Sequence, residues 1–120
     1  MASLQYPFPD LPAPGTTAEV APGVRWLRMP LPFQLNHINL WLLEDEGGCT
    51  IVDTGIGNEE TRGHWEAILG EIKNVRRVIL THYHPDHAGN AAWLCEKFGV
   101  ELWTTQGEYM TAHAVRAAAA

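Results

Sequence analysis

The segment from His82 to His87 carries the residue types best suited to chemistry in this chain. It reads His-Tyr-His-Pro-Asp-His, which places three imidazoles and one carboxylate close together. Neutral imidazole nitrogens and carboxylate oxygens are ligands that zinc and similar metals accept. A loop that only caps a helix needs one such side chain, whereas this loop supplies four. The segment therefore predicts a metal site.

The residues around this segment predict how its side chains are held. A buried strand is expected just before His82, and in extended backbone His82 and His84 face the same way. Pro85 biases His84 away from helical backbone. Asp86 and His87 fall at the start of a helical pattern, where adjacent side chains diverge. We therefore expect the first two histidines to share one metal, and the last two residues to address a second position.

At these residues the chain resembles the metallo-β-lactamase fold superfamily. The family signature is the same H-x-H-x-D-H, preceded by Thr and followed by a small residue and Gly, and Thr81 and residues 88–89 match it. The upstream motif of the family, an Asp after an apolar strand, is matched by Asp53 after residues 49–52. The resemblance covers about residues 23–105. It implies an α/β fold, an αβ/βα sandwich with a metal-hydroxide site at the sheet edges.

The resemblance also implies roles for individual residues. His82 and His84 would bind one metal, and Asp86 and His87 would bind the other. A complete site would hold two Zn²⁺ ions, with iron or manganese as alternatives. Asp86 would orient the attacking hydroxide while serving as a ligand, which makes it the expected catalytic residue. Asp53 would brace the metal loop without belonging to the ligand set.

The ligands present in this chain do not complete such a site. The family adds further His and Asp ligands downstream, but the only later histidine here is His113, in an Ala-rich helical pattern. A lone helical histidine is usually a surface or core residue. A catalytic zinc normally has three protein ligands, so four ligands leave two metals short. We therefore expect residues 23–120 to be the N-terminal half of a metallo-β-lactamase-like domain, which forms a homo-oligomer or associates with the missing C-terminal half.

The pattern of the chain predicts a mixed sheet with helices on one face. The strands expected from apolar or alternating patterns span residues 24–29, 38–44, 49–52, 75–80 and 101–104. Residues 44–48 would form the hairpin turn between the second and third of these strands. Helices are expected at residues 58–72, capped by Asn58, and before Gly99, a good residue to follow a helix. Strand–helix–strand order implies parallel crossovers, and half a sandwich would expose an apolar sheet face.

Two further segments are distinctive. Residues 1–22 contain five prolines, which oppose regular structure and predict an extended arm. The loop of residues 28–37 joins two predicted strands. In the family this loop borders the substrate cleft, so Phe33 and His37 are candidates for substrate contact. In the alternative interpretation, His37 only caps the next strand.

Composition and charge narrow the class of protein. The apolar fraction of 46% is ordinary for a globular domain. No apolar stretch reaches transmembrane length and the N-terminus lacks the pattern of a signal peptide, so we expect a cytoplasmic protein without a membrane partner. In that compartment Cys49 and Cys95 should be reduced thiols. The net charge of −6 argues against a nucleic-acid partner.

These features together predict a metal-dependent hydrolase that acts on a small-molecule substrate. The expected bond is an ester, thioester or lactone, attacked by a metal-bound hydroxide, since zinc lowers the pKa of bound water to about 7. Two other interpretations stay open. One is an iron-dependent oxidoreductase of the same fold, because the ligand types do not exclude iron. The other is a non-catalytic fragment or pseudo-enzyme whose site is never completed.

Overall fold

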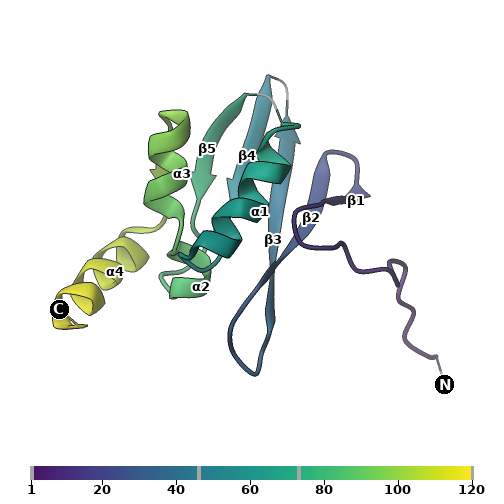
Figure 1. The fold of residues 1–120 in the computed structure, drawn as a ribbon, viewed down its shortest axis with the longest axis horizontal. Helices are drawn as coiled ribbons and strands as arrows, with labels where there is room; N and C mark the ends of the chain where they lie inside the picture. Colours follow the sequence, from purple (N-terminus) through teal and green to yellow (C-terminus); the bar gives the residue numbers. More distant parts are fainter. Residues whose placement is uncertain (1, 46, 73, 120) are drawn as a thin grey trace.

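One mixed sheet organises the chain in the computed structural model, which describes residues 2–45, 47–72 and 74–119. The sheet follows the chain in the order β1-β2-β3-β4-β5-β6 (Figure 1). The strands are β1 (Ala18–Ala21), β2 (Val24–Pro30), β3 (His37–Asp45), β4 (Gly48–Val52), β5 (Val75–Ile79) and β6 (Glu101–Trp103). The helices of the described residues are α1 (Glu59–Leu69), α2 (Pro85–Ala88), α3 (Ala91–Phe98) and α4 (Gln106–Ala119).

The sheet changes from antiparallel to parallel at β4. Strands β1 to β4 pair antiparallel with their neighbours, whereas β4 with β5 and β5 with β6 pair parallel. Each parallel pair needs a crossover, and these crossovers contain α1 and α3. Both helices lie on the same face of the sheet (Figure 1). The predicted mixed sheet with helices on one face is confirmed.

The hydrophobic core lies between this face and the two helices. Apolar side chains from β2 to β5 are buried there with Trp65 of α1 and Leu94 of α3, both of which are 0% exposed. Cys49 belongs to the same core, and burial raises the pKa of its thiol to about 11. Cys49 and Cys95 are both free, as predicted.

Local signals place the ends of the helices. Asn58 caps α1 as predicted, with its side-chain oxygen accepting a hydrogen bond from Thr61 N at 2.8 Å. The helix was expected to reach residue 72 but ends at Leu69, because Gly70 has poor helix propensity. Gly99 follows α3 with φ of +61°, the left-handed conformation predicted for it. The predicted hairpin joins β3 to β4, although its residue 46 lies outside the described residues.

The prediction that residues 1–22 lack regular structure is wrong for β1. This strand pairs antiparallel with β2, where Ala18 lies opposite Trp26. The prolines of the arm stop at Pro14 and resume at Pro22, so the residues between them keep the amide hydrogens that edge pairing requires. Described residues before Ala18 form turns and irregular backbone only.

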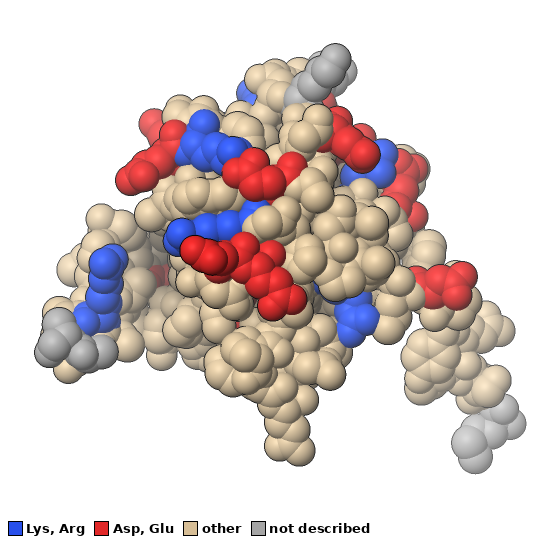
Figure 2. Space-filling view, viewed as in Figure 1, with Lys and Arg blue, Asp and Glu red and all other residues tan. Residues whose placement is uncertain are grey.

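Charged side chains of both signs are mixed on the face that α1 and α3 form (Figure 2). Some of them link the two helices: Lys97 Nζ of α3 lies 2.8 Å from Glu66 Oε1 of α1. Exposed pairs of this kind contribute at most about 1 kcal/mol each. Within the described ranges, no helix is long and apolar enough to span a bilayer.

Candidate metal centre

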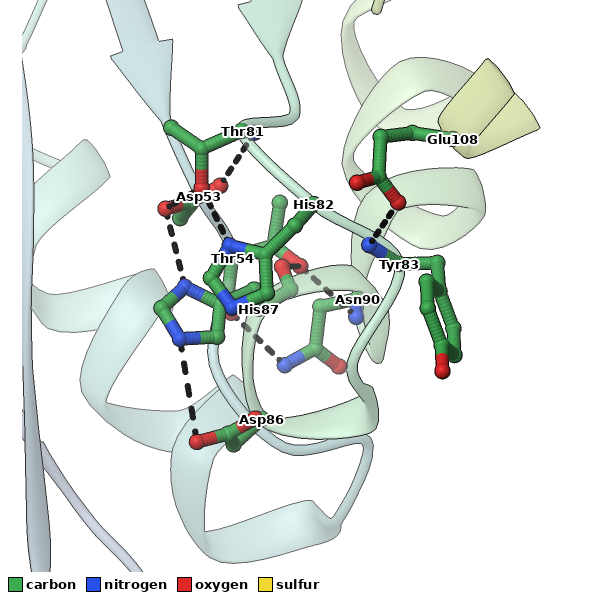
Figure 3. A network of polar contacts seen from close by, with 9 residues as sticks. All are labelled: Asp53, Thr54, Thr81, His82, Tyr83, Asp86, His87, Asn90 and Glu108. Atoms are coloured by element: carbon green, nitrogen blue, oxygen red, sulfur yellow. Dashed lines mark hydrogen bonds and ion pairs between the residues drawn. The ribbon is translucent and has the colours of Figure 1, made fainter. Parts of the chain in front are cut away.

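The candidate site lies where two parallel strands end side by side. Asp53 directly follows β4, and its N–H donates to the carbonyl of Ile79, the last residue of β5, at 2.8 Å. Loops that leave the carboxyl ends of parallel strands meet at one edge of the sheet. Asp53 has φ of +64°, a left-handed conformation that Asp tolerates better than most residues. Its side chain thereby points to the loop after β5 (Figure 3).

The Asp53 carboxylate accepts three hydrogen bonds from that loop and from α2 (Figure 3). Oδ1 accepts from Thr81 N at 2.8 Å, and Oδ2 accepts from Thr81 Oγ1 at 2.7 Å. Oδ2 also lies 2.9 Å from His87 Nδ1. The residue is only 5% exposed, and a buried carboxylate is costly unless it is paired and hydrogen-bonded. These donors satisfy the carboxylate and join three parts of the site.

His87 is held between two carboxylates. Because the Asp53 carboxylate can only accept, Nδ1 of the imidazole carries a proton, and Nε2 is the nitrogen left to face a metal. Asp86 Oδ2 lies 3.7 Å from that Nε2. Metal-binding histidines usually donate their other ring N–H to a carboxylate or carbonyl in this way. A carboxylate oxygen of Asp86 and Nε2 of His87 therefore lie close together, and their binding of one metal stays a prediction.

The orientation of His82 is tied to the same carboxylate through Thr81. His82 Nδ1 lies 2.8 Å from Thr81 Oγ1. Since that hydroxyl donates its hydrogen to Asp53, it can only accept from His82, so the His82 proton also lies on Nδ1. His82 Nε2 is then left as a ligand atom. One carboxylate thus assigns the tautomers of two imidazoles.

The other histidines differ in their relation to this arrangement. The His84 ring meets the His82 ring edge to face, with 4.8 Å between centroids. His84 precedes Pro85 with φ of −55° and ψ of 142°, the extended backbone that was predicted. His113 lies on α4 beside Tyr109, with ring centroids 4.5 Å apart. Among the described residues, His113 is not brought to the compact metal-binding group.

The compact group within the described ranges consists of Asp53, His82 and His87, whose possible ligand atoms lie within 4.8 Å of one another. Asp53 already accepts three hydrogen bonds, so we interpret it as a brace, in the role predicted for it. His84 and Asp86 lie beside this group, each next to one histidine. The assignment of the four ligands to two metal positions stays a prediction.

The predicted substrate-contact residues lie on the connection between β2 and β3. This connection is at the end of the molecule where α2 lies (Figure 1). Phe33 is 60% exposed there. His37 is the first residue of β3, lies opposite Pro30, and has Nδ1 3.1 Å from Asn36 Oδ1. Contact with substrate stays a prediction for both.

The structure also brings in residues that the sequence did not mark. Glu108 of α4 accepts a hydrogen bond from Tyr83 N at 3.1 Å and holds the loop between the first two histidines. Thr54 and Asn90 are fully buried polar residues next to the two motifs. Their proximity to the motifs was the only available signal, since a sequence pattern does not reveal that a polar side chain is buried. The role of Glu108 could not be recognised from the sequence, because Glu108 and Tyr83 are far apart along the chain.

A family model for the metallo-beta-lactamase superfamily matches residues 34–116, which include Asp53 and the segment from His82 to His87. The chain belongs to the metallo-beta-lactamase superfamily. Relatives of this superfamily member include a hydroxyacylglutathione hydrolase of Haemophilus influenzae, which is 36% identical over 75 residues covering 59% of this chain and 31% of the relative. A probable metallo-hydrolase of Bacillus subtilis is 34% identical over 71 residues, with the same two shares. The chain therefore spans about a third of the length of the curated relatives it matches.

Solved structures of the superfamily agree with the fold. A beta-lactamase domain protein from Burkholderia ambifaria is 57% identical and superposes with a TM-score of 0.87, covering 94% of this chain and 39% of its own. A metallo-beta-lactamase family protein from Thermus thermophilus is 34% identical, with a TM-score of 0.68 and shares of 76% and 31%. The metallo-beta-lactamase DIM-1 shares the fold at 18% identity, with a TM-score of 0.71 and shares of 84% and 46%.

The donor set of the site suits the metals expected for this superfamily. Imidazole nitrogens and carboxylate oxygens bind zinc, iron and manganese. The two thiols lie elsewhere: Cys49 is in the core and Cys95 is on α3. The hydrogen bonds use Nδ1 of His82 and Nδ1 of His87, so Nε2 of each ring is available to a metal. The described residues thus fit a metal bound by nitrogen and oxygen.

Asp53→Asn tests the bracing role directly. The amide keeps the size of the side chain but loses the charge and one acceptor, so His87 is no longer fixed with its Nε2 free. We expect the affinity for zinc to fall by about 10–100-fold, the usual effect of removing such a partner. Competition with a chromophoric chelator measures this affinity. Asp10→Asn, an exposed residue of the N-terminal arm, is the control, and equal affinities for the two variants would show that Asp53 is no brace.

Proposed function

We propose that this chain contributes to a hydrolase that uses two zinc ions to cleave an ester, thioester or lactone bond in a small molecule. The observation that carries the proposal is the position of His87, which Asp53 fixes through Nδ1 while Nε2 lies next to Asp86. Relatives of the chain support the reaction class, since they include hydroxyacylglutathione hydrolases of Haemophilus influenzae and Albidiferax ferrireducens. Hydrolysis of an acyl bond is therefore the activity we infer.

Each residue has a defined task in this proposal. His82 and His84 would hold one metal, and Asp86 and His87 would hold the other. The metal site would supply Lewis acidity and lower the pKa of a bound water to about 7. Asp86 has a half-buried carboxylate that can accept a hydrogen bond from the attacking water and so orient it. Asp53 and Thr81 keep the imidazole protons on Nδ1, so that neither ring has to rotate when a metal binds. Other segments of the protein would add the ligands still needed.

Asp86→Asn tests the proposed activity in the complete zinc-loaded protein. Loss of the charge should lower kcat/KM for a hydroxyacyl thioester by about 2–4 kcal/mol of transition-state stabilisation, the scale of one preorganised electrostatic contact. His64→Ala on α1, whose ring faces Glu60 at 3.8 Å, is the control and should retain both zinc and activity.

Two results would contradict the proposal. The first is a zinc-loaded protein that hydrolyses no thioester, ester or lactone. The second is stoichiometric iron with its optical spectrum, which would favour the oxidoreductase interpretation instead.

The sheet face opposite the helices supports a proposal about partners. A single row of paired residues crosses all six strands, and most of its members are large and apolar. The row consists of Ala18, Trp26, Trp41, Val52, Ile79 and Trp103. Trp103 is 51% exposed, and Leu43 beside the row is 37% exposed. Large apolar side chains that stay partly exposed along one sheet face favour an interface, so we propose that another segment of the protein or a second copy covers this face.

Trp41→Glu tests this proposal because Trp41 lies in the middle of the row. Residues 1–120 produced alone should self-associate through the uncovered face, and a buried carboxylate in that contact is costly. We expect sedimentation velocity to show oligomers for the original chain and a larger share of monomer for the variant. Leu4→Glu, at an exposed apolar residue of the N-terminal arm, should leave association unchanged. A monodisperse monomer of the original chain would refute the proposal that a second copy covers this face.

A further inference from the structure

Thr54 binds the backbone of α2 at His87. Its N–H donates to the carbonyl of His87 at 2.8 Å, and its hydroxyl donates to the same oxygen at 2.6 Å. Thr54 is 0% exposed and directly follows Asp53, whose carboxylate holds the His87 ring. His87 is therefore fixed at both ends, through its carbonyl by Thr54 and through Nδ1 by Asp53.

Asn90 completes this connection from the other side. Its Nδ2 donates to the carbonyls of Thr54 and Ile56, at 3.0 and 2.8 Å, and its N–H donates to Thr54 Oγ1 at 3.0 Å. Its Oδ1 accepts from Arg62 Nε of α1 at 3.1 Å. These partners assign the amide orientation, since two carbonyls require the nitrogen. Asn90 is 0% exposed, so this set of bonds is shielded from water.

The position of Asn90 makes this use of its side chain unusual. Asn90 is the N-cap residue of α3, where an Asn side chain normally accepts a hydrogen bond from the first turn of the helix. No such bond forms here. The amide instead binds the loop after β4, so its contribution goes to the site and not to the end of α3.

The two backbones meet closely beside these bonds. A Cβ placed on Gly57 would lie 2.8 Å from the carbonyl oxygen of Gly89, which is closer than side chains approach backbone atoms. The loop after β4 and the segment after α2 therefore lie in direct backbone contact. With the hydrogen bonds of Thr54 and Asn90, this contact leaves little room for either segment to move alone.

We propose that Thr54 and Asn90 are positioning residues for the second metal position, the one assigned to Asp86 and His87. They hold α2 against the loop that carries Asp53, and so keep His87 Nδ1 within hydrogen-bond distance of the carboxylate before any metal binds. The inference rests on the proposed function, because it concerns the affinity of that site for zinc. Ligand side chains that are already held in place lose less conformational freedom when a metal binds. Removing the hydrogen bonds of Thr54 and Asn90 should therefore weaken metal affinity.

Matched substitutions separate positioning from stability. Thr54→Val keeps the shape but removes the hydroxyl, whereas Thr54→Ser keeps the hydroxyl. Asn90→Asp keeps the shape but replaces the two N–H donors by an oxygen that faces two carbonyls. Asn58→Ala is the control, since Asn58 caps α1 and makes its side-chain bond to Thr61 only within that helix end. It should lower thermal stability without touching the metal.

The experiment measures zinc affinity by chelator competition and the d–d spectrum after Co²⁺ replacement, on the full protein. We expect Thr54→Val and Asn90→Asp to weaken the second equivalent of zinc by about tenfold or more and to change the cobalt spectrum. Thr54→Ser and Asn58→Ala should bind within about twofold of the original protein. The weaker zinc binding and the changed cobalt spectrum of Thr54→Val and Asn90→Asp should appear whether or not a substrate is turned over.

Three other outcomes would overturn the inference, and each is distinct. Original-strength binding of both zinc ions by folded Thr54→Val and Asn90→Asp would do so while leaving the proposed function intact, as would an equal loss of affinity in Asn58→Ala. A protein that binds no zinc before substitution would remove the proposed function and the inference with it. If Thr54→Val does not fold, the comparison of Asn90→Asp with Asn58→Ala decides.

Discussion

The buried carboxylate of Asp53 is the group on which the site depends. An isolated carboxylate in this position would cost several kcal/mol, and only donors placed around it can offset that cost. Thr81 provides two of these donors and His87 the third. Because hydrogen bonds to an ionised group are stronger than neutral ones, the three bonds hold the strand end, the loop and the short helix in one geometry. The placement of the ring protons of His82 and His87 on Nδ1 follows from these bonds.

The sheet explains why these groups meet at all. Parallel pairing of β4 with β5 brings the residue after each strand to the same edge. The core also contacts the loop after β4. Trp65 of α1 is fully buried, and its Nε1 donates to the carbonyl of Thr54 at 2.8 Å. Thr54 therefore links the packing of α1 against the sheet to the position of His87. A change in the core near Trp65 should be felt at the site even though no ligand is altered.

Much of this arrangement could be predicted from the sequence, and the remainder has physical causes. Asn58 and Gly99 gave correct helix ends because capping depends on a few adjacent residues. Strand β1 was missed, since its pairing depends on an available edge and not on its own weak pattern. The His-x-His-x-Asp-His motif could be recognised because its spacing is local. Asn90 and Glu108 could not, because their contacts join segments far apart in sequence, and a buried amide looks like any other polar residue before folding.

Diffraction from zinc-soaked crystals at the zinc absorption edge tests most directly whether Asp53 braces the site or binds the metal. We expect anomalous peaks beside Nε2 of His82 and Nε2 of His87, with the Asp53 carboxylate still accepting the hydrogen bond from His87 Nδ1. A peak within bonding distance of an Asp53 oxygen, or of Nδ1 of either ring, would contradict the assignment of that carboxylate as the brace.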